Sequence, residues 1–241
     1  MPENVLSVIT ALISVAGAMI SLWFSRHAAQ HDRVVAAEAL AVKFREPLIQ
    51  AAFNLETRLY NILEQDFLQR FLLSGVADQD RDYAEDNTLY VLGQYFCWVE
   101  IIRRESQYLD PRDRARNRVV SQHLEEIRDV FATSERFENP VFRLFRGEQR
   151  AVAEVMLVPV HEPQQGLPRW ECMGYAAFVA ALRNDDFNRW FIRLREDITA
   201  LAKEPDLHRE RLVGAQHALV GLIEVLDPEG DRVPLALRER L

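Results

Sequence analysis

The hydrophobic pattern of this chain begins with one long apolar run. Residues 5–24 read VLSVITALISVAGAMISLWF, twenty consecutive positions without a charged side chain. At a rise of 1.5 Å per residue, a helix of this length crosses the ~30 Å hydrocarbon layer of a bilayer once. A cleaved signal peptide is the alternative, because Ala16-Gly17-Ala18 resembles a cleavage site, but no basic residue precedes the run and it continues to Phe24. We therefore expect residues 1–25 to form an uncleaved transmembrane anchor.

Charged residues are distributed unevenly around this run. Glu3 is the charged side chain before it, whereas Arg26, Arg33, Lys43 and Arg45 follow it. Positive charges collect on the cytoplasmic side of membrane helices. The charge pattern therefore predicts a single-pass protein of the cell inner membrane, in contact with membrane lipid, with its N-terminus outside and the bulk of the chain in the cytoplasm.

Small side chains recur every seven residues within the run, and an uncharged series continues through residues 26–46, where we expect a juxtamembrane helix. The series consists of Ser7, Ser14, Ser21, Ala28, Val35 and Val42, with Gly17 on the same helix face. Small residues on one face let two membrane helices approach closely, and a seven-residue period is typical of coiled coils. This oligomerisation seam predicts a homodimer or a higher homo-oligomer. The alternative is that these residues only favour a helix.

Beyond the anchor, apolar residues recur at helical spacing from residue 47 to residue 226. Breaks in this pattern predict helices at 47–74, 83–109, 112–133, 141–158, 172–183, 186–202 and 208–226. Glu46-Pro47 should kink or break the helix that arrives from the membrane. The end of 141–158 could be a short strand, residues 159–168 a linker or lid, and residues 227–241 a loosely ordered tail.

Composition agrees with a helical fold. Nine glycines and ten prolines together make about 8% of the 241 residues, against a usual ~12%. A β-sandwich or barrel needs frequent turns, so this composition argues against one. We expect an all-α protein, a multi-helix bundle over residues 47–226. The net charge of −8 argues against nucleic acid as a partner, because phosphate backbones are bound by basic surfaces.

The most apolar cytoplasmic segment, TLYVLGQYFCWVEII, predicts the central helix of the bundle. Gly93 within it indicates that a neighbouring element approaches closely. Glu100 and Arg104 are four residues apart on this helix, and an isolated buried charge is costly. We therefore expect these two side chains to form an ion pair.

Three arginines suggest a binding site. Arg143, Arg146 and Arg150 follow the spacing i, i+3, i+7, so on one helix they would share a face. Guanidinium groups match the oxygen atoms of a phosphate or a nucleotide. The same arginines could instead form an ion-pair ladder with an acidic helix at residues 122–129, and the many carboxylates of the chain favour this second interpretation.

Metal ligation is weakly indicated. His27 and His31 are four residues apart and could hold zinc or copper. The preferred interpretation is that both are polar residues at the membrane surface. Asp78, Asp80 and Asp82 resemble the opening of a calcium loop, although Tyr83 stands where glycine is required. We expect no metal and no cofactor, and we expect Cys97 and Cys172 to be reduced thiols.

Three segments carry a resemblance to known proteins. They are FREPLIQAAFNLETRLYNILEQDFL, YAEDNTLYVLGQYFCWVEIIRRE and FRLFRGEQRAVAEVML. Over most of residues 5–160 the chain resembles uncharacterised bacterial proteins with one N-terminal membrane helix and a cytoplasmic helical domain. The resemblance implies this architecture, and because that group has no established activity it carries over no functional residue.

The function predicted from these patterns is binding rather than catalysis. The chain has no glycine-rich phosphate loop, nucleophile elbow, HExxH, CxxC or kinase motif. We expect a membrane-anchored interaction or sensor-effector module that self-associates. The alternatives are a helical-bundle hydrolase with a carboxylate or arginine site, and a pore-forming defence effector.

Overall fold

The computed structural model describes residues 23, 44–73, 75, 77–105, 114–137, 139–161 and 169–241. Trp23 is helical and 58% exposed. The remainder of the predicted anchor, the whole oligomerisation seam, and the histidines at 27 and 31 lie outside the described residues, as does most of the predicted lid at 159–168. Within the described ranges, no helix is both long enough and apolar enough to cross a membrane.

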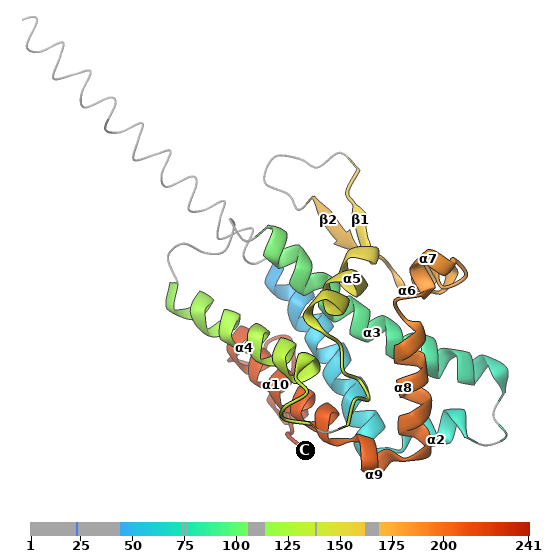
Figure 1. The fold of residues 1–241 in the computed structure, drawn as a ribbon. Coiled ribbons are helices and arrows are strands. Elements are labelled where there is room, and N and C mark those ends of the chain that lie inside the picture. The colour runs from blue at the N-terminus through green and yellow to red at the C-terminus, as the bar shows by residue number, and fades with distance from the viewer. Residues whose placement is uncertain are drawn as a thin grey trace, which may run out of the picture.

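The described part of the chain is mostly helical, which confirms the all-α class (Figure 1). After the helix of residues 44–64 come α2 (Phe67–Leu72), α3 (Asp78–Arg104), α4 (Arg114–Ala132), α5 (Arg146–Val155), β1 (Leu157–Pro159), β2 (Trp170–Cys172), α6 (Tyr175–Ala181), α7 (Asp185–Asn188), α8 (Ile192–Lys203), α9 (Pro205–His208), α10 (Glu210–Leu226) and the 3₁₀ helix η2 (Leu235–Leu237). The two strands form an antiparallel hairpin in which Val158 faces Glu171.

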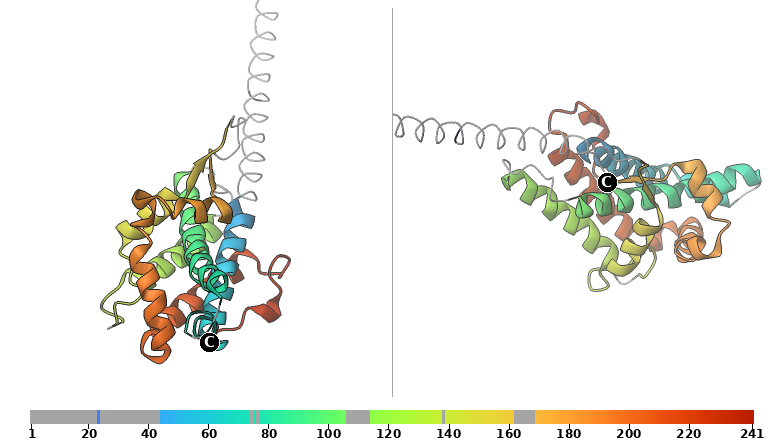
Figure 2. Two further views of the ribbon diagram at one scale, coloured as in Figure 1. Left: turned by 90° about the vertical axis from the view of Figure 1, so that its right-hand side faces the viewer. Right: turned by 90° about the horizontal axis from the view of Figure 1, so that it is seen from above.

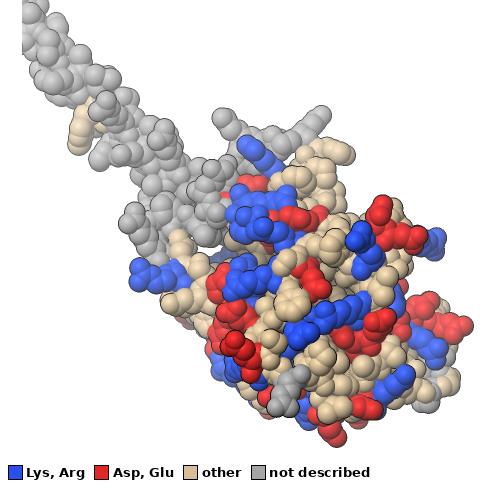
Figure 3. All heavy atoms as spheres, in the orientation of Figure 1, with Lys and Arg blue, Asp and Glu red and all other residues tan. Residues whose placement is uncertain are grey.

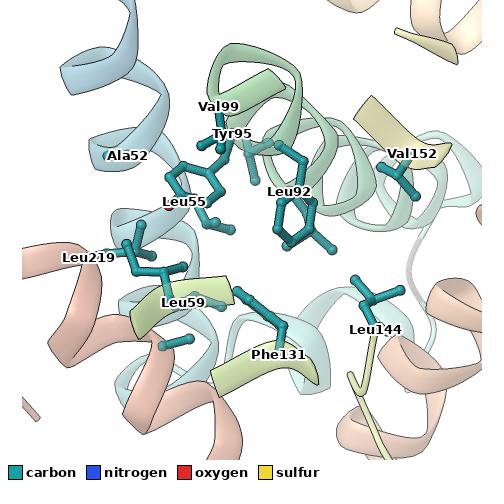
Figure 4. Packing of buried hydrophobic residues seen from close by; sticks show 14 of the residues in the cluster. Ala52, Leu55, Leu59, Leu92, Tyr95, Val99, Phe131, Leu144, Val152 and Leu219 are labelled. Atoms are coloured by element: carbon teal, nitrogen blue, oxygen red, sulfur yellow. The ribbon is translucent and has the colours of Figure 1, made fainter. Parts of the chain in front are cut away.

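The hydrophobic core lies around α3 and the helix of residues 44–64 (Figure 4). Leu55 and Tyr95 from these two helices, Phe131 from α4 and Leu219 from α10 meet there, and each is at most 1% exposed. Val152 of α5 is also buried and joins this helix to the core. In Figure 1, α4 and α10 lie to the left of the central pair, and α5 lies in front of α3.

Helix α3 is the central element that the apolar segment predicts, but it begins earlier than expected. Asp78 and Asp80 lie in its first turn and Arg103 and Arg104 in its last. Acidic residues at the N-terminus and basic residues at the C-terminus stabilise a helix through its dipole. The expected start at Tyr83 is therefore wrong, because the acidic stretch extends the helix instead of preceding it.

The close approach predicted at Gly93 is confirmed. A Cβ atom at this position would overlap the sulfur atom of Met156, and the ring of Phe191 lies 3.5 Å from the same point. Met156 follows α5 directly and is fully buried. The missing side chain therefore sets how closely the end of α5 can lie against α3.

The predicted helix 47–74 differs at both ends. Of the kink or break expected at Glu46-Pro47, the break is wrong, because residues 44–64 are helical through Pro47. Phe44 and Leu48 are one turn apart and both buried, and a continuous helix keeps both against the core. The chain breaks instead at Asp66, which has φ of 52°, a left-handed conformation that aspartate tolerates better than most residues.

The predicted helix 141–158 is shorter than expected. Phe142 has φ of 56°, its ring is buried, and its N–H donates to Asp197 Oδ2 at 2.9 Å. The contact with α8 holds this residue outside a helix, and α5 begins only at Arg146. At the other end the strand alternative is confirmed, since Leu157–Pro159 is β1.

The last three predicted helices are each interrupted. The segment 172–183 begins as β2 and becomes helical only at Tyr175. The segment 186–202 divides into α7 and α8, and Asn184 caps α7 by accepting from Asp186 N at 2.9 Å. The segment 208–226 divides into α9 and α10 at Arg209. Each interruption spans only a few residues, which is too short to disturb the spacing of apolar residues along the sequence.

The C-terminal tail is ordered, so the prediction of loosely ordered residues 227–241 is wrong. The carboxylate of Asp227 is buried and accepts from the backbone N–H of Val233 at 2.9 Å and from Arg238 Nη2 at 2.8 Å. Val233 is itself 2% exposed. Gln216 of α10 donates to the carbonyl oxygen of Glu239 at 2.6 Å. A buried polar network thus folds the tail back onto the bundle.

Candidate functional site

A recess of about 300 Å³ opens between α3, α4 and α5 and is here called the arginine pocket. Its lining residues are Phe96, Val99, Glu100, Arg103, Arg128, Arg146, Gly147, Gln149, Arg150 and Ala153. The lining thus holds four guanidinium groups and one carboxylate, and two further carboxylates, Glu125 and Asp129 of α4, pair with Arg128 and Arg146 at its edge. Figure 3 shows basic side chains interleaved with acidic ones over this face of the molecule.

Glu100 forms the base of the arginine pocket and is 5% exposed. Arg103 holds it in a bidentate contact, Nε and Nη2 each donating at 2.7 Å, and Arg104 Nε donates at 2.8 Å. The predicted ion pair between Glu100 and Arg104 is thus confirmed. Burial alone would raise the pKa of Glu100, but the bonds from Arg103 and Arg104 outweigh it and hold the pKa below its usual value. The carboxylate is therefore ionised, neutralised and fixed.

Arg146, the first residue of α5, forms the predicted ladder with the acidic face of α4. Its Nη1 donates to Glu125 at 2.8 Å and its Nη2 to Asp129 at 2.5 Å. Arg128 Nη1 donates to the same Glu125 at 2.5 Å. The side chains of Arg146, Glu125 and Asp129 are about half exposed or more, so each pair contributes only ~0–1 kcal/mol to stability. Their main effect is to orient the guanidinium groups.

Arg150 lies one turn further along α5 and is the least engaged of the four arginines. Its side chain is 53% exposed, and Nε is 4.0 Å from Glu100, the longest of the ion pairs in this region. Glu154, four residues after Arg150 on the same helix, accepts from Arg104 at 3.2 Å. Arg150 is thus placed at the rim with its guanidinium directed toward the pocket.

Arg143 does not belong to the pocket. It lies in the turn before α5, so the expectation that all three arginines share one helix is wrong for this residue. Its guanidinium lies 5.1 Å from the ring centre of Phe145, and its Nε is buried without a hydrogen-bond partner. The left-handed conformation of Phe142 directs this segment away from the α5 face.

The N-terminal end of α5 also faces the pocket, through Gly147. The side chain of Glu148 accepts from the N–H of Phe145 at 2.7 Å. Gln149 is buried and donates to the carbonyl oxygens of Leu144 at 2.8 Å and Arg128 at 2.9 Å, which fixes α5 against α4. Because helix N-termini carry partial positive charge, this end adds to the positive field of the arginines.

Sequence reasoning identified Arg146 and Arg150 but missed Arg103 and Arg128. These two come from α3 and α4, far from α5 in the chain, and helical spacing relates residues only within one helix. Arg103 carried a usable signal, since it is three residues from Glu100 and such pairs meet on a helix as those four apart do. The sequence around Arg128 carried no such signal.

Other candidate positions show no comparable arrangement. Asp78 and Asp80 lie in the first turn of α3. Over the ranges that the structure describes, no group of three or more histidine, cysteine or acidic side chains is arranged to hold a metal ion. Cys97 is buried and Cys172 half-buried, and both are free thiols.

A larger open groove of about 920 Å³ runs along α4 and the turn that follows it. Its charged residues are Arg118, Glu125, Glu126, Asp129, Glu135 and Arg136, four carboxylates against two guanidinium groups. The net negative charge of this groove repels anions, in contrast to the arginine pocket. The arginine pocket is therefore the candidate site with the clearer chemistry, which is to hold an anionic group.

Comparisons of the chain with protein family models, with curated proteins and with solved structures give no significant match.

Proposed function

We propose that this chain is a single-pass membrane-anchored module whose helical domain faces the cytoplasm and works by binding and self-association. The observation that carries the proposal is the run of twenty uncharged residues at 5–24, preceded by Glu3 and followed by basic residues. A polypeptide segment with this length and composition is favoured in a bilayer.

The position of the first core residues supports a direct connection between the anchor and the domain. Phe44 and Leu48 are 5% and 1% exposed and belong to the hydrophobic core. Only residues 25–43 separate them from the apolar run. A folded domain joined this closely to a membrane anchor remains at the bilayer surface, which suits recognition of partners or ligands there.

Topology is tested with reporter fusions on the full chain. A C-terminal reporter that is active only in the cytoplasm should be active, and one that is active only outside it should be silent. The mature protein should retain its N-terminal residues. The reverse reporter pattern, or a mature protein that begins after residue 18, would contradict the proposal.

Self-association is tested by crosslinking in membranes. Replacing Ser14 and Gly17 with isoleucine should weaken crosslinking, because branched side chains hold the two backbones apart. Ala16→Ile is the matched control, since residue 16 lies two positions from Ser14 and on the opposite helix face. An equal effect of all the substitutions, or none, would place the contact elsewhere.

A deletion separates this proposal from the pore-forming alternative. Removing residues 1–25 should release the protein from membranes. If overproduction of the full chain is toxic and the deletion abolishes the toxicity, the pore-forming alternative gains support. If overproduction is harmless, the binding module is favoured.

A further inference from the structure

We propose that the arginine pocket binds a small phosphorylated molecule. The pocket is built entirely from residues 96–153, so this inference goes beyond membrane attachment and does not depend on it. Four features support it: the balance of charge, the fixed orientation of the guanidinium groups, the helix end that faces the pocket, and the apolar part of its lining.

The charge of the lining favours a dianion. Four guanidinium groups line the pocket, and each is already close to a carboxylate: Arg103 and Arg150 to Glu100, and Arg128 and Arg146 to Glu125 or Asp129 at the edge of the pocket. A phosphate monoester carries a charge between −1.5 and −2 near neutral pH and three acceptor oxygens, whereas a carboxylate carries −1 and two oxygens. The phosphoryl group, with more negative charge and more acceptor oxygens, therefore competes better than a carboxylate for these guanidinium groups.

The arginines are oriented before any ligand arrives. Arg103 is fixed on α3 by its bidentate contact with Glu100, and Arg146 on α5 by Glu125 and Asp129 of α4. Guanidinium groups on two different helices thus line one recess, and guanidinium groups match the oxygen atoms of a phosphate. Arg150, whose ion pair is the longest at 4.0 Å, is the arginine most available to a ligand.

The start of α5 adds donors of a second kind. The first N–H groups of a helix have no acceptor within it, and helix N-termini bind phosphate groups for this reason. Gly147, the second residue of α5, lines the pocket, and a Cβ atom placed there would meet no atom within 4 Å. The backbone is therefore open to a ligand at this point.

The lining also has an apolar part, formed by Phe96, Val99 and Ala153. A volume of about 300 Å³ lies at the lower end of the range for small-molecule sites. The pocket therefore has room for a phosphoryl group with a compact organic part. A sugar phosphate or a nucleoside monophosphate has this form, and the apolar surface would contact its carbon skeleton.

The ion pairs of Arg146 permit exchange. They are exposed to solvent, so water and salt weaken them, and a phosphoryl oxygen can replace Glu125 or Asp129 at a small cost. Binding should therefore weaken as ionic strength rises.

The test uses the full chain in a neutral detergent at low ionic strength. Calorimetric titration and thermal melting are carried out with inorganic phosphate, a sugar monophosphate and a nucleoside monophosphate, with citrate as the carboxylate comparison. Short-chain phosphatidic acid, added to the micelles, tests whether a lipid headgroup is the source of the phosphoryl group. Arg146→Gln and Arg150→Gln remove guanidinium groups of the pocket. Arg209→Gln is the matched control, because Arg209 is an exposed arginine paired with Glu64 on another part of the surface.

At least one phosphorylated probe should bind and raise the melting temperature. Each pocket variant should lower the affinity about tenfold or more while leaving the ligand-free melt almost unchanged, and Arg209→Gln should behave as the unchanged protein. Binding of phosphatidic acid alone would identify a lipid headgroup as the ligand. The proposal is overturned if no phosphorylated probe binds, if Arg146→Gln and Arg150→Gln bind as well as the unchanged chain, or if citrate binds as tightly. None of these outcomes alters the topology and crosslinking results.

Discussion

Arg211 on α10 donates a 2.6 Å hydrogen bond to the carbonyl oxygen of Val130, in the last turn of α4. The same guanidinium also bonds the carbonyl oxygens of Thr133 at 2.9 Å and Asn139 at 3.2 Å, and it lies 4.8 Å from the ring centre of Phe137. Arg211 is 2% exposed. A buried cation thus satisfies carbonyl groups that the end of a helix leaves without partners.

Arg211→Gln should therefore destabilise the protein strongly. A shorter side chain leaves several buried carbonyl groups unpaired, at a cost of about 3 kcal/mol or more in total. The free energy of unfolding, measured by urea titration in detergent, checks this. Arg209→Gln, two residues away, removes an exposed pair and should cost at most ~1 kcal/mol. Similar losses in both variants would contradict the capping role.

Gly93→Ala should lower stability even though alanine is the better helix former. The new methyl group must displace the buried side chain of Met156, and overpacking of this kind costs about 1–3 kcal/mol. Combining the added methyl group with a shorter neighbour, as Gly93→Ala with Met156→Ala, should cost less than the sum of the two single changes, which a double-mutant cycle measures.

Gly147→Ala is the matched control for this prediction. It also lies in a helix, but a Cβ atom there meets no atom within 4 Å. The substitution should be neutral or should stabilise by about 0.4–1 kcal/mol. If both glycine variants behave alike, contact with Met156 does not account for Gly93.

Glu100→Gln should destabilise far more than Arg146→Gln. The buried carboxylate receives hydrogen bonds from two arginines, and hydrogen bonds to charged groups contribute about 1.5–3 kcal/mol each. Arg146 forms exposed pairs worth at most ~1 kcal/mol each. Thermal and urea unfolding of both variants test the difference, and equal losses would show that the ladder on α4 stabilises the bundle as much as the base of the arginine pocket does.

Asp227 should make stability depend on acid pH. Burial would raise its pKa, but the N–H groups of Val233 and Arg232 and the charge of Arg238 hold the pKa below the usual 3.8. A carboxyl group whose pKa is lower in the folded state stabilises the fold above its unfolded pKa of ~3.9, and this contribution is lost as the pH falls through the folded pKa.

Asp227→Asn should therefore cost about 3 kcal/mol at neutral pH, and its difference from the unchanged protein should narrow as the pH falls below ~4. Urea unfolding at stepwise lower pH measures this difference. Asp231→Asn, on the exposed part of the same tail, should stay within ~0.5 kcal/mol of the unchanged protein throughout. A pH-independent loss for Asp227→Asn would contradict the assignment.

The sequence was most informative where a property depends on one helix. The burial of α3, the contact at Gly93 and the pair of Glu100 with Arg104 all follow from spacing along a single element. It was least informative where one residue changes the chain direction, because helical periodicity does not mark the left-handed conformations of Asp66 and Phe142, and Phe142 is held in place by a contact with Asp197 of α8.

The arginine pocket shows the same division. Arg146 and Arg150 were found because they share α5, whereas Arg103 and Arg128 come from helices that periodicity cannot place beside it. The ordered tail was missed for a related reason. Its order depends on one buried carboxylate, Asp227, and proline and glycine content gives no indication of such a contact.

The first helix of the domain is fastened to the last part of the chain. Arg45 Nε donates to the carbonyl oxygen of Leu226 at 2.6 Å, across 181 positions of sequence, and Glu46 pairs with Arg232. Figure 2 shows the tail beside the helix of residues 44–64. At a synthesis rate of 5–20 residues per second, the ribosome adds Leu226 about 10–40 s after Arg45.

During that interval the helix of residues 44–64 has been made, but α10, which supplies Gln216 to its buried Glu56, has not. A ribosome that stalls before residue 210 would leave this apolar face exposed beside the nascent apolar run of residues 5–24. Exposed apolar surface of this kind makes incomplete chains prone to aggregation. Residues 210–241, which are translated well after residues 44–64, thus determine whether that helix is protected.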